Sequence, residues 1–506
     1  QDQSTAFFNG GLFSSYRGDK YDMHFIFNND NLKMAENGGI TDDRYITNPL
    51  DMAEGKKEYS ANEIPTRLSQ IWNHNTSYHA FLTHRYNLGF YKEKQDSVDT
   101  DSVKITQVFV PVTSFIHTLQ VDLNNRKYIS YDDAQNQKYF EHNYLGTDSI
   151  DKTKRTSIKN TIGIALQEGF NKWAKAGLTA FLSYEYRNFA LTDTTNIPGQ
   201  RIINNYKESS LSIGGELSKK QGKLLHYNIL GELAIAGEDA GQFSVEGRGD
   251  LNLRLFGDTV RLDVNAFIKN QNPVFYFRHF QSKHYWWDNN DLSKIMRTRL
   301  EGKLSLNRWG TQLRAGVENI KNYTYLANAS IPVKDSEGNV TGFKNNAAVR
   351  QYSGNIQIFT AMLQQKLKVG IFHLDGEVAY QKSSEQDILP LPELSAYGNL
   401  YMKFGLAKKV LQIEMGADVR YFSKYYAPDY SPVIGQFYNQ NPDDKIEIGA
   451  FPIVNVYANL HLKRTRFFIM MYHVNAGSGK SNYFLAPHYP INPRMIKFGL
   501  SWNFFD

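Results

Sequence analysis

Histidines and carboxylates are the residues that could perform acid–base or metal chemistry in this chain, and their spacing favours neither. The 13 His are scattered, and none stands in an HExxH or comparable ligand pattern. Asp22, Asp30, Asp42 and Asp43 could attract calcium, but they lack the regular spacing of an EF-hand loop. The chain has no Cys, which excludes disulfides and Cys-based metal or redox sites. We therefore expect no enzyme activity, no metal and no cofactor.

One histidine cluster is different, because aromatic and acidic residues surround it. Its members are His279, His284, Trp286, Trp287, Asp288 and Asp291. They lie in a long connection between two predicted strands. We expect an aromatic surface loop there, with contact to a sugar or a lipid headgroup as the alternative.

The residues that do repeat regularly are charged side chains at every second position. In 242–256 the polar positions include Glu246, Arg248 and Asp250, and the positions between them are small or apolar. Successive side chains of a strand point to opposite faces, so such a segment has one charged and one apolar face. The charged faces predict the wall of a water-filled channel. The pore-lining candidates are Arg85, Arg187, Arg248, Arg254, Arg261, Arg297, Arg299, Arg314, Asp375, Glu377, Glu414, Asp418 and Arg420.

Two sectors of this predicted wall differ in charge. The polar faces between 242 and 320 carry more basic than acidic residues, whereas 371–423 leans acidic. We expect a field across the channel and a weak preference for anions. The alternative is that these charges pair with neighbours on adjacent strands and largely cancel.

About 19 segments of this kind follow one another along the chain. They start near residues 6, 20, 77, 112, 155, 174, 207, 223, 242, 259, 294, 310, 352, 371, 394, 410, 450, 466 and 493. Many alternate for longer than the five or six residues usual in globular strands, and a tilted strand needs about 9 to 11 residues to cross a bilayer. A soluble β-sandwich is the alternative, since it also has two-faced strands.

The connections decide between these two folds, because short and long ones alternate. Short turns are predicted at 170–173, 307–310 and 407–409, with long connections such as 29–76 and 271–293 between them. The stretch 93–111 is the one long connection on the side of the short turns. Short periplasmic turns opposite long outer loops are typical of outer-membrane barrels. We expect an all-β protein, a transmembrane antiparallel β-barrel of about 18 to 20 strands with short periplasmic turns and long extracellular loops.

Composition agrees with a barrel. The chain has 506 residues with 14% aromatic residues and 37 Gly, its mean hydropathy is −0.50, and it lacks a window of about 20 apolar residues for a membrane helix. The net charge of +6 is mild and spread along the chain, so nucleic acid is a poor candidate partner. We expect one domain over 1–506. Since single-chain bacterial barrels use even strand numbers, we also expect a strand or region upstream of residue 1.

Three segments resemble a known family. Residues 7–45 read FFNGGLFSSYRGDKYDMHFIFNNDNLKMAENGGITDDRY, residues 83–91 read THRYNLGFY, and residues 111–120 read PVTSFIHTLQ. They are similar to the putative porin family of Bacteroidota outer membranes, and the similarity extends through the N-terminal third and into the terminal strand. The resemblance implies a plug-free barrel, a passive channel and a location in the bacterial outer membrane.

The function expected from the sequence is an outer-membrane porin that lets small polar solutes diffuse through a charged, water-filled lumen. We expect one long outer loop to fold inward, 29–76 first and 271–293 second. The alternative is a structural or partner-binding barrel with an occluded lumen; a plugged active transporter and a catalytic barrel are less favoured. Expected partners are outer-membrane lipid and lipopolysaccharide and small polar solutes, and a homo-oligomer or association with other outer-membrane proteins is compatible with this reading.

Overall fold

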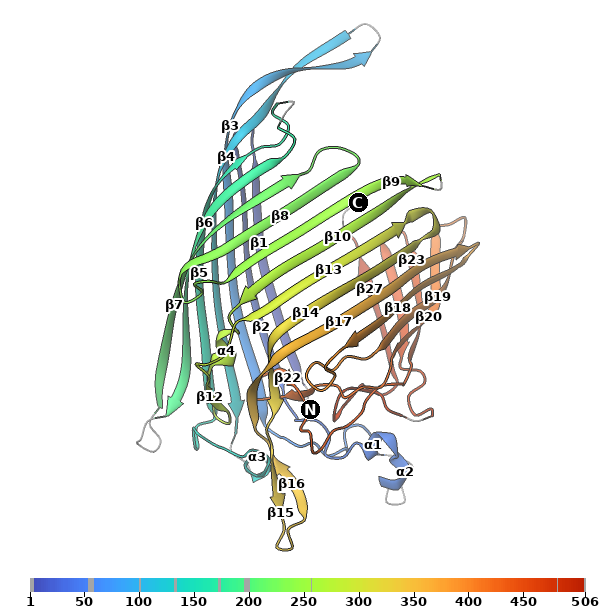
Figure 1. The fold of residues 1–506 in the computed structure, drawn as a ribbon. Helices are drawn as coiled ribbons and strands as arrows, with labels where there is room; N and C mark the ends of the chain where they lie inside the picture. The colour runs from blue at the N-terminus through green and yellow to red at the C-terminus, as the bar shows by residue number, and fades with distance from the viewer. Residues whose placement is uncertain are drawn as a thin grey trace.

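The structure, a computed structural model, describes residues 4–52, 59–99, 102–131, 134–171, 174–194, 201–255, 257–479 and 481–504. Within these ranges 19 strands form one antiparallel sheet that bends into a barrel (Figure 1). Each strand of the sheet pairs with the next one along the chain. The strands are β1 (Thr5–Arg17), β2 (Tyr21–Ala35), β3 (Ile71–Asp99), β4 (Ser102–Ser130), β5 (Ile150–Leu166), β6 (Gly177–Thr194), β7 (Arg201–Lys219), β8 (Leu225–Gly237), β9 (Phe243–Leu255), β10 (Asp258–Gln271), β13 (Ile295–Leu306), β14 (Thr311–Asn328), β17 (Ala347–Val369), β18 (Phe372–Ser383), β19 (Leu394–Leu406), β20 (Leu411–Phe422), β23 (Ile453–Leu462), β24 (Thr465–Tyr472) and β27 (Met495–Trp502).

The structure confirms the predicted barrel and its two kinds of connection. Short turns such as 370–371, 463–464 and the 3-10 helix η1 (Asn307–Trp309) lie at the end of the barrel that also holds the C-terminus. Long loops lie at the opposite end, where β1 begins (Figure 1). No helix in the described ranges is both long and apolar enough to cross a bilayer.

Small elements fill the long loops. The helices are α1 (Arg44–Thr47), α2 (Pro49–Met52), α3 (Ala134–Tyr139) and α4 (Phe275–Arg278). The short strands pair as β11 (His279–Gln281) with β12 (Trp286–Asp288), β15 (Ile331–Lys334) with β16 (Val340–Lys344), β21 (Asp429–Ser431) with β22 (Gln436–Tyr438), and β25 (Phe484–Ala486) with β26 (Tyr489–Pro490). The described parts of these loops therefore contain regular secondary structure.

Two predicted connections are wrong in their extent. The first long outer loop is 36–70 rather than 29–76, because β2 continues to Ala35 and β3 begins at Ile71. Within the 93–111 stretch, residues 93–99 and 102–111 belong to the paired ends of β3 and β4, which extend well past the short turns (Figure 1). Pairing satisfies the backbone groups of these strand ends outside the bilayer, so strand structure continues beyond the membrane-spanning length.

The edge strands β1 and β27 run in the same direction, as the first and last of an odd number of antiparallel strands must. No backbone pairing joins these two strands within the described residues. The further strand expected upstream of residue 1 stays a prediction.

The apolar face of the sheet generates the first test. Leu300, Val317 and Phe359 form a cross-strand row on that face, with 55%, 53% and 45% of their surfaces exposed. Leu300→Lys should lower the free energy of unfolding by about 2 to 4 kcal/mol, because it places a charge in the hydrocarbon. Thr360→Lys, on the opposite face, should cost much less. Urea unfolding in lipid vesicles measures both; equal losses would contradict the assignment of the faces.

Candidate functional site

The 13 pore-lining candidates lie on one face of the sheet. Directly opposed residues of antiparallel strands project from the same face, so the register can be followed from strand to strand. One such row passes from Arg85 in β3 through Ile116 in β4 and Phe181 in β6 to Lys269 in β10 and Arg297 in β13. The candidates between β3 and β20 have the same parity as this row.

This polar face encloses space. A cavity of about 1060 Å³ is lined by Ser77 of β3, Arg155 of β5 and Arg187 of β6, and also by Tyr323 and Tyr325 of β14, which lies far from them around the sheet. The polar faces of distant strands line one cavity, so they point inward. The opposite, apolar face points outward toward lipid.

Most charges on the polar face between residues 242 and 320 pair with a neighbour. Arg261 lies 2.8 Å from Asp263, Arg297 is paired with Glu318, and Arg299 with Glu301. Further pairs are Lys269–Glu246, Lys303–Asp263, Arg314–Glu301 and Lys403–Glu414. The alternative of local pairing therefore describes this sector better than a strong transverse field.

The remaining candidates are held differently. Asp418 accepts a hydrogen bond from Asn455 (2.9 Å), and the Arg420 guanidinium lies over the Tyr397 ring at 5.9 Å. Arg85, Arg248, Arg254 and Glu377 have no ion pair with a described residue, and Asp375 has none either. Arg248 and Arg254 are exposed, and Arg85, Asp375 and Glu377 are half-buried.

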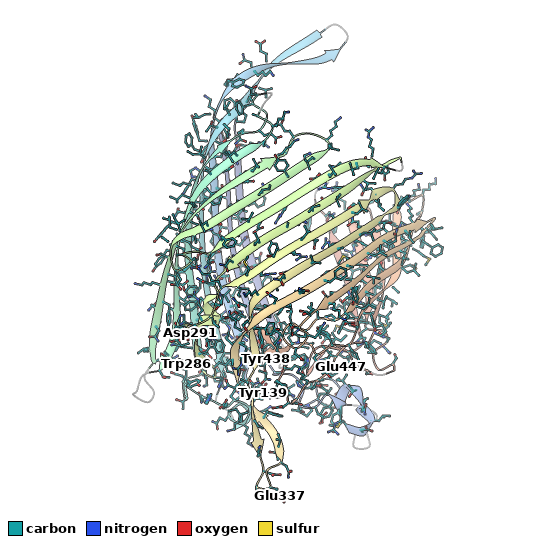
Figure 2. The ribbon with its side chains drawn as sticks, viewed as in Figure 1. Tyr139, Trp286, Asp291, Glu337, Tyr438 and Glu447 are labelled. Atoms are coloured by element: carbon teal, nitrogen blue, oxygen red, sulfur yellow. The ribbon has the colours of Figure 1, made fainter. Side chains whose placement is uncertain are left out.

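At the outer end, several loops meet in a buried apolar group, here called the outer-loop cluster. Its members are Leu68, Ile71, Tyr128, Phe140, Phe280, Tyr285, Trp287, Leu326, Ala347, Val433 and Tyr438. Figure 2 shows labelled residues of three such loops gathered at this end: Tyr139, Trp286, and Tyr438 with Glu447. Glu337 marks a hairpin tip that points away. The loops thus pack on one another across the mouth.

Loop 272–294 turns inward, and the expectation of an aromatic surface loop is wrong for His284 and Trp287, whereas Trp286 is 50% exposed. Tyr285 is fully buried, His284 is 4% exposed and Trp287 8%. The Tyr285 hydroxyl hydrogen-bonds Asn345 and, at 3.0 Å, Ser431. Buried aromatic groups of this loop supply much of the outer-loop cluster, which explains their number in the sequence.

Of the two loops expected to narrow the opening, 272–294 lines the cavity directly. Loop 36–70 contributes Leu68 to the outer-loop cluster and Ile40 and Ile46 to a second buried group with Phe484, and none of its described residues lines the cavity. The expectation that one of the two loops narrows the opening stays a prediction.

Charged groups fix the inward loop to the barrel wall. Glu208 of β7, 8% exposed, lies 2.7 Å from Arg278 of α4 and 3.1 Å from Arg187 of β6. Arg278 also reaches Glu238 (2.6 Å), and Arg187 reaches Asp239 (2.6 Å). Two arginines sharing one buried carboxylate hold α4 against the wall.

A second polar group ties the end of β2 to the loops. The Glu36 carboxylate accepts hydrogen bonds from Asn73 (2.6 Å) and the Tyr430 hydroxyl (2.9 Å). Burial raises the pKa of Glu36 above its ordinary value of 4.5, although both hydrogen bonds and nearby Arg126 oppose the shift. Ionisation of Glu36 is therefore less favourable in the packed loops than in water.

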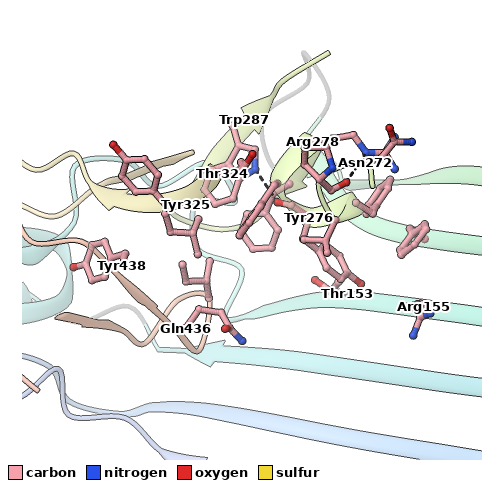
Figure 3. Close-up of a pocket in the computed structure, with 18 of the residues that line it drawn as sticks. Thr153, Arg155, Asn272, Tyr276, Arg278, Trp287, Thr324, Tyr325, Gln436 and Tyr438 are labelled. Carbon is pink, nitrogen blue, oxygen red and sulfur yellow. Dashed lines mark hydrogen bonds between the residues drawn. The ribbon is translucent and has the colours of Figure 1, made fainter. Parts of the chain in front are cut away.

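The candidates chosen from sequence missed several residues of the cavity. Figure 3 shows Thr153 and Arg155 of β5 on one side and Tyr276, Arg278 and Trp287 of the inward loop on the other. Arg155 could have been predicted from the period-two alternation of its strand, because it lies two positions before Ser157 and on the same face. The loop residues carry no periodic signal. No group of three His, Asp or Glu side chains within the described ranges could hold a metal.

The fold and this wall define an outer-membrane β-barrel transport protein. The whole chain, residues 1–506, matches the model of the family described as "Putative porin", and the protein belongs to that family. No curated protein matches the chain.

Solved structures that resemble the chain are outer-membrane receptors of low identity, so they bear on the fold alone. The siderophore receptor PirA from Acinetobacter baumannii has TM-score 0.61 and 10% identity, over 98% of this chain and 70% of that one. BauA, the ferric preacinetobactin receptor of the same organism, has TM-score 0.53 and 11% identity, with coverage of 99% and 72%. The FrpB iron transporter from Neisseria meningitidis has TM-score 0.50 and 11% identity, with coverage of 98% and 79%.

The shared carboxylate gives a stability test. Glu208→Gln should destabilise the docked loop by about 3 kcal/mol, because two partly buried arginines lose their common anion. Glu393→Gln is the control, because the Glu393–Lys382 pair is exposed (53% and 59%, 3.6 Å). Loss of this pair should lower the free energy of unfolding by less than about 1 kcal/mol. The readouts are the temperature at which the unheated gel band is lost and proteolysis within 272–294. Equal behaviour of the two variants would refute the anchoring role.

Glu36 gives a pH test. Its folded-state pKa is raised, so its contribution to stability is complete below 4.5 and is lost as pH rises through the folded value. Loop 36–70 should therefore resist protease better at pH 5 than at pH 8, and Glu36→Gln should flatten this dependence. Asp42→Asn is the control, because Arg44 lowers the pKa of Asp42 and its titration lies below this window. If the protease resistance of Glu36→Gln depended on pH as strongly as that of the parent, the account would be contradicted.

Proposed function

We propose that the protein is a porin for passive diffusion of small polar solutes. The observation that carries the proposal is the continuous polar face of the strands, which encloses space between distant parts of the sheet. A barrel of this strand number is too wide for its own side chains to fill. A wall of paired charges stays hydrated without binding a solute tightly, which suits diffusion.

In this proposal, the barrel wall selects solutes by polarity and the outer loops select them by size. Paired charges favour polar over apolar solutes and discriminate weakly between anions and cations, because most of the fields cancel. Size selection belongs to the outer end, where loop 272–294 and the outer-loop cluster reduce the opening. Passive diffusion through the lumen needs no catalytic group. The barrel itself is surrounded by outer-membrane lipid and lipopolysaccharide.

A second candidate function is a partner-binding barrel whose lumen is occluded. The observation that favours it is the burial of the outer-loop cluster, in which Tyr285, Val433 and Ile71 are almost inaccessible. Loops packed this tightly could close the mouth and present a folded surface to a partner. Conductance distinguishes the two candidates.

The test is single-channel recording in a planar bilayer. The parent should show ohmic steps. Gln271 and Ile295 are directly paired, so residues 273–293 can be replaced by a short Gly-Asn turn that leaves the wall intact. This variant should conduct severalfold more than the parent, because the inward loop no longer narrows the lumen.

The matched control shortens the β15–β16 hairpin, whose strand residues Ile331–Lys334 are exposed and which points away from the mouth (Figure 2). Its conductance should equal that of the parent. Steps in the loop-shortened variant alone would support the occluded barrel. Absence of steps in every sample would refute diffusion.

A further inference from the structure

One row of polar side chains on the cavity wall has no partner among the described residues, unlike most charges on the polar face between residues 242 and 320. Ser77 of β3 is directly opposite Asn124 of β4, which is opposite Arg155 of β5. All three line the cavity, and no hydrogen bond or ion pair joins their side chains to other described residues. Hydroxyl, amide and guanidinium groups are thus available side by side.

The next row toward the loops adds to this polar wall. Asn75 is opposite Arg126, and Arg126 is opposite Thr153. Arg126 donates to Asn73 and to the Val433 carbonyl oxygen, whereas the Thr153 hydroxyl is buried without a partner among the described residues. A buried hydroxyl without a hydrogen bond is costly, and a small side-chain rotation would let a ligand satisfy it.

Aromatic rings face this polar wall across the cavity. Tyr323 and Tyr325 of β14 are stacked at 5.9 Å with an interplanar angle of 8°. A β-bulge directs both rings inward: the register shifts between Lys321 and Tyr323, and Asn322 has φ 58°, which Asn tolerates better than most residues. Tyr276 of the inward loop adds a third ring to the lining of the cavity (Figure 3).

The balance of charge in the cavity is positive. Its lining includes the four arginines 126, 155, 187 and 278 against the carboxylates of Glu208 and Asp239. Those two carboxylates are already bound by Arg187 and Arg278. Arg155 is therefore free for an anion.

We propose that this cavity binds a short acidic saccharide. The inference rests on the proposed function in one respect, namely that solutes pass this cavity on their way through the barrel. Sugar hydroxyls would pair with Ser77 and Asn124, a carboxylate on the sugar with Arg155, and the apolar faces of the rings would lie on Tyr325 and Tyr276. The cavity volume of about 1060 Å³ suits more than one sugar unit, since small-molecule sites usually have about 300 to 1,000 Å³.

Other small ligands match the lining less well. A simple anion would use Arg155 and leave the amides and the aromatic rings unused. A neutral sugar would leave the free guanidinium without a counter-charge. An apolar molecule would leave the polar row without partners, at the cost of desolvating these groups. An acidic peptide is the nearest competitor and forms an arm of the test.

The experiment is calorimetric titration of the full-length protein in detergent with digalacturonate, lactose, acetate and a glutamate dipeptide. Digalacturonate should bind the most tightly. Arg155→Gln should weaken its binding by about tenfold or more while leaving lactose unchanged, because one charge-assisted hydrogen bond is lost. Tyr325→Leu should weaken both sugars.

Arg254→Gln is the matched control, since Arg254 is an exposed lumen-face arginine near the short turns, far from the cavity. It should bind like the parent, and all variants should keep the parent's heat-dependent gel shift. Equal binding of acetate, dipeptide or lactose, no binding of digalacturonate, or an unchanged affinity in Arg155→Gln would overturn the inference. Calorimetry does not require conduction: binding without conductance would refute diffusion alone, and conductance without binding would refute this site alone.

Discussion

The hydrocarbon of a bilayer offers no water to a backbone N–H or C=O, and this constraint governs the molecule. Each strand must give all its backbone hydrogen bonds to its neighbours, which produces the unbroken series of antiparallel pairs from β1 to β27. The chain can then vary only its side chains along the membrane. Alternation follows, because one face meets lipid and the other does not.

Under the proposed function, the same constraint places solute selection at the outer end. Strand pairing fixes the wall, so selectivity can come only from side chains on the inner face and from loops outside the hydrocarbon. Loop 272–294 uses both: Arg278 is anchored by Glu208 of the wall, and Tyr285 and Trp287 pack among the other loops. The cavity exists because a folded loop spans part of a wide lumen without filling it.

The sequence predicted the strands well and the cavity poorly, for physical reasons. Along the membrane-spanning strands, apolar residues that face lipid alternate with residues that face the lumen. The starts of β19 at Leu394 and of β10 at Asp258 could therefore be predicted to within a residue or so. In the β15–β16 hairpin, the turn residue Gly338 has a positive φ of 88°, which glycine adopts without steric cost.

The loops follow no such periodic rule. Nothing in the local sequence around Trp287 distinguishes a ring buried against Phe280 from one exposed at the surface. The bulge at Asn322 is similarly hidden, because one inserted residue reverses the faces of Tyr323 and Tyr325 relative to a regular strand. Loop packing depends on contacts between segments hundreds of residues apart, as between Asn73 and Pro432, which only the folded chain reveals.

The central claim is that the polar face lines a water-filled lumen. The chain has no Cys, so single cysteines can report accessibility without background. Arg248→Cys, Arg314→Cys and Glu377→Cys should react with a charged, water-soluble maleimide in intact lipid vesicles. Val264→Cys, Leu300→Cys and Val317→Cys should react only with a lipid-soluble reagent. Labelling of the second set by the charged reagent, or protection of the whole first set, would contradict the account.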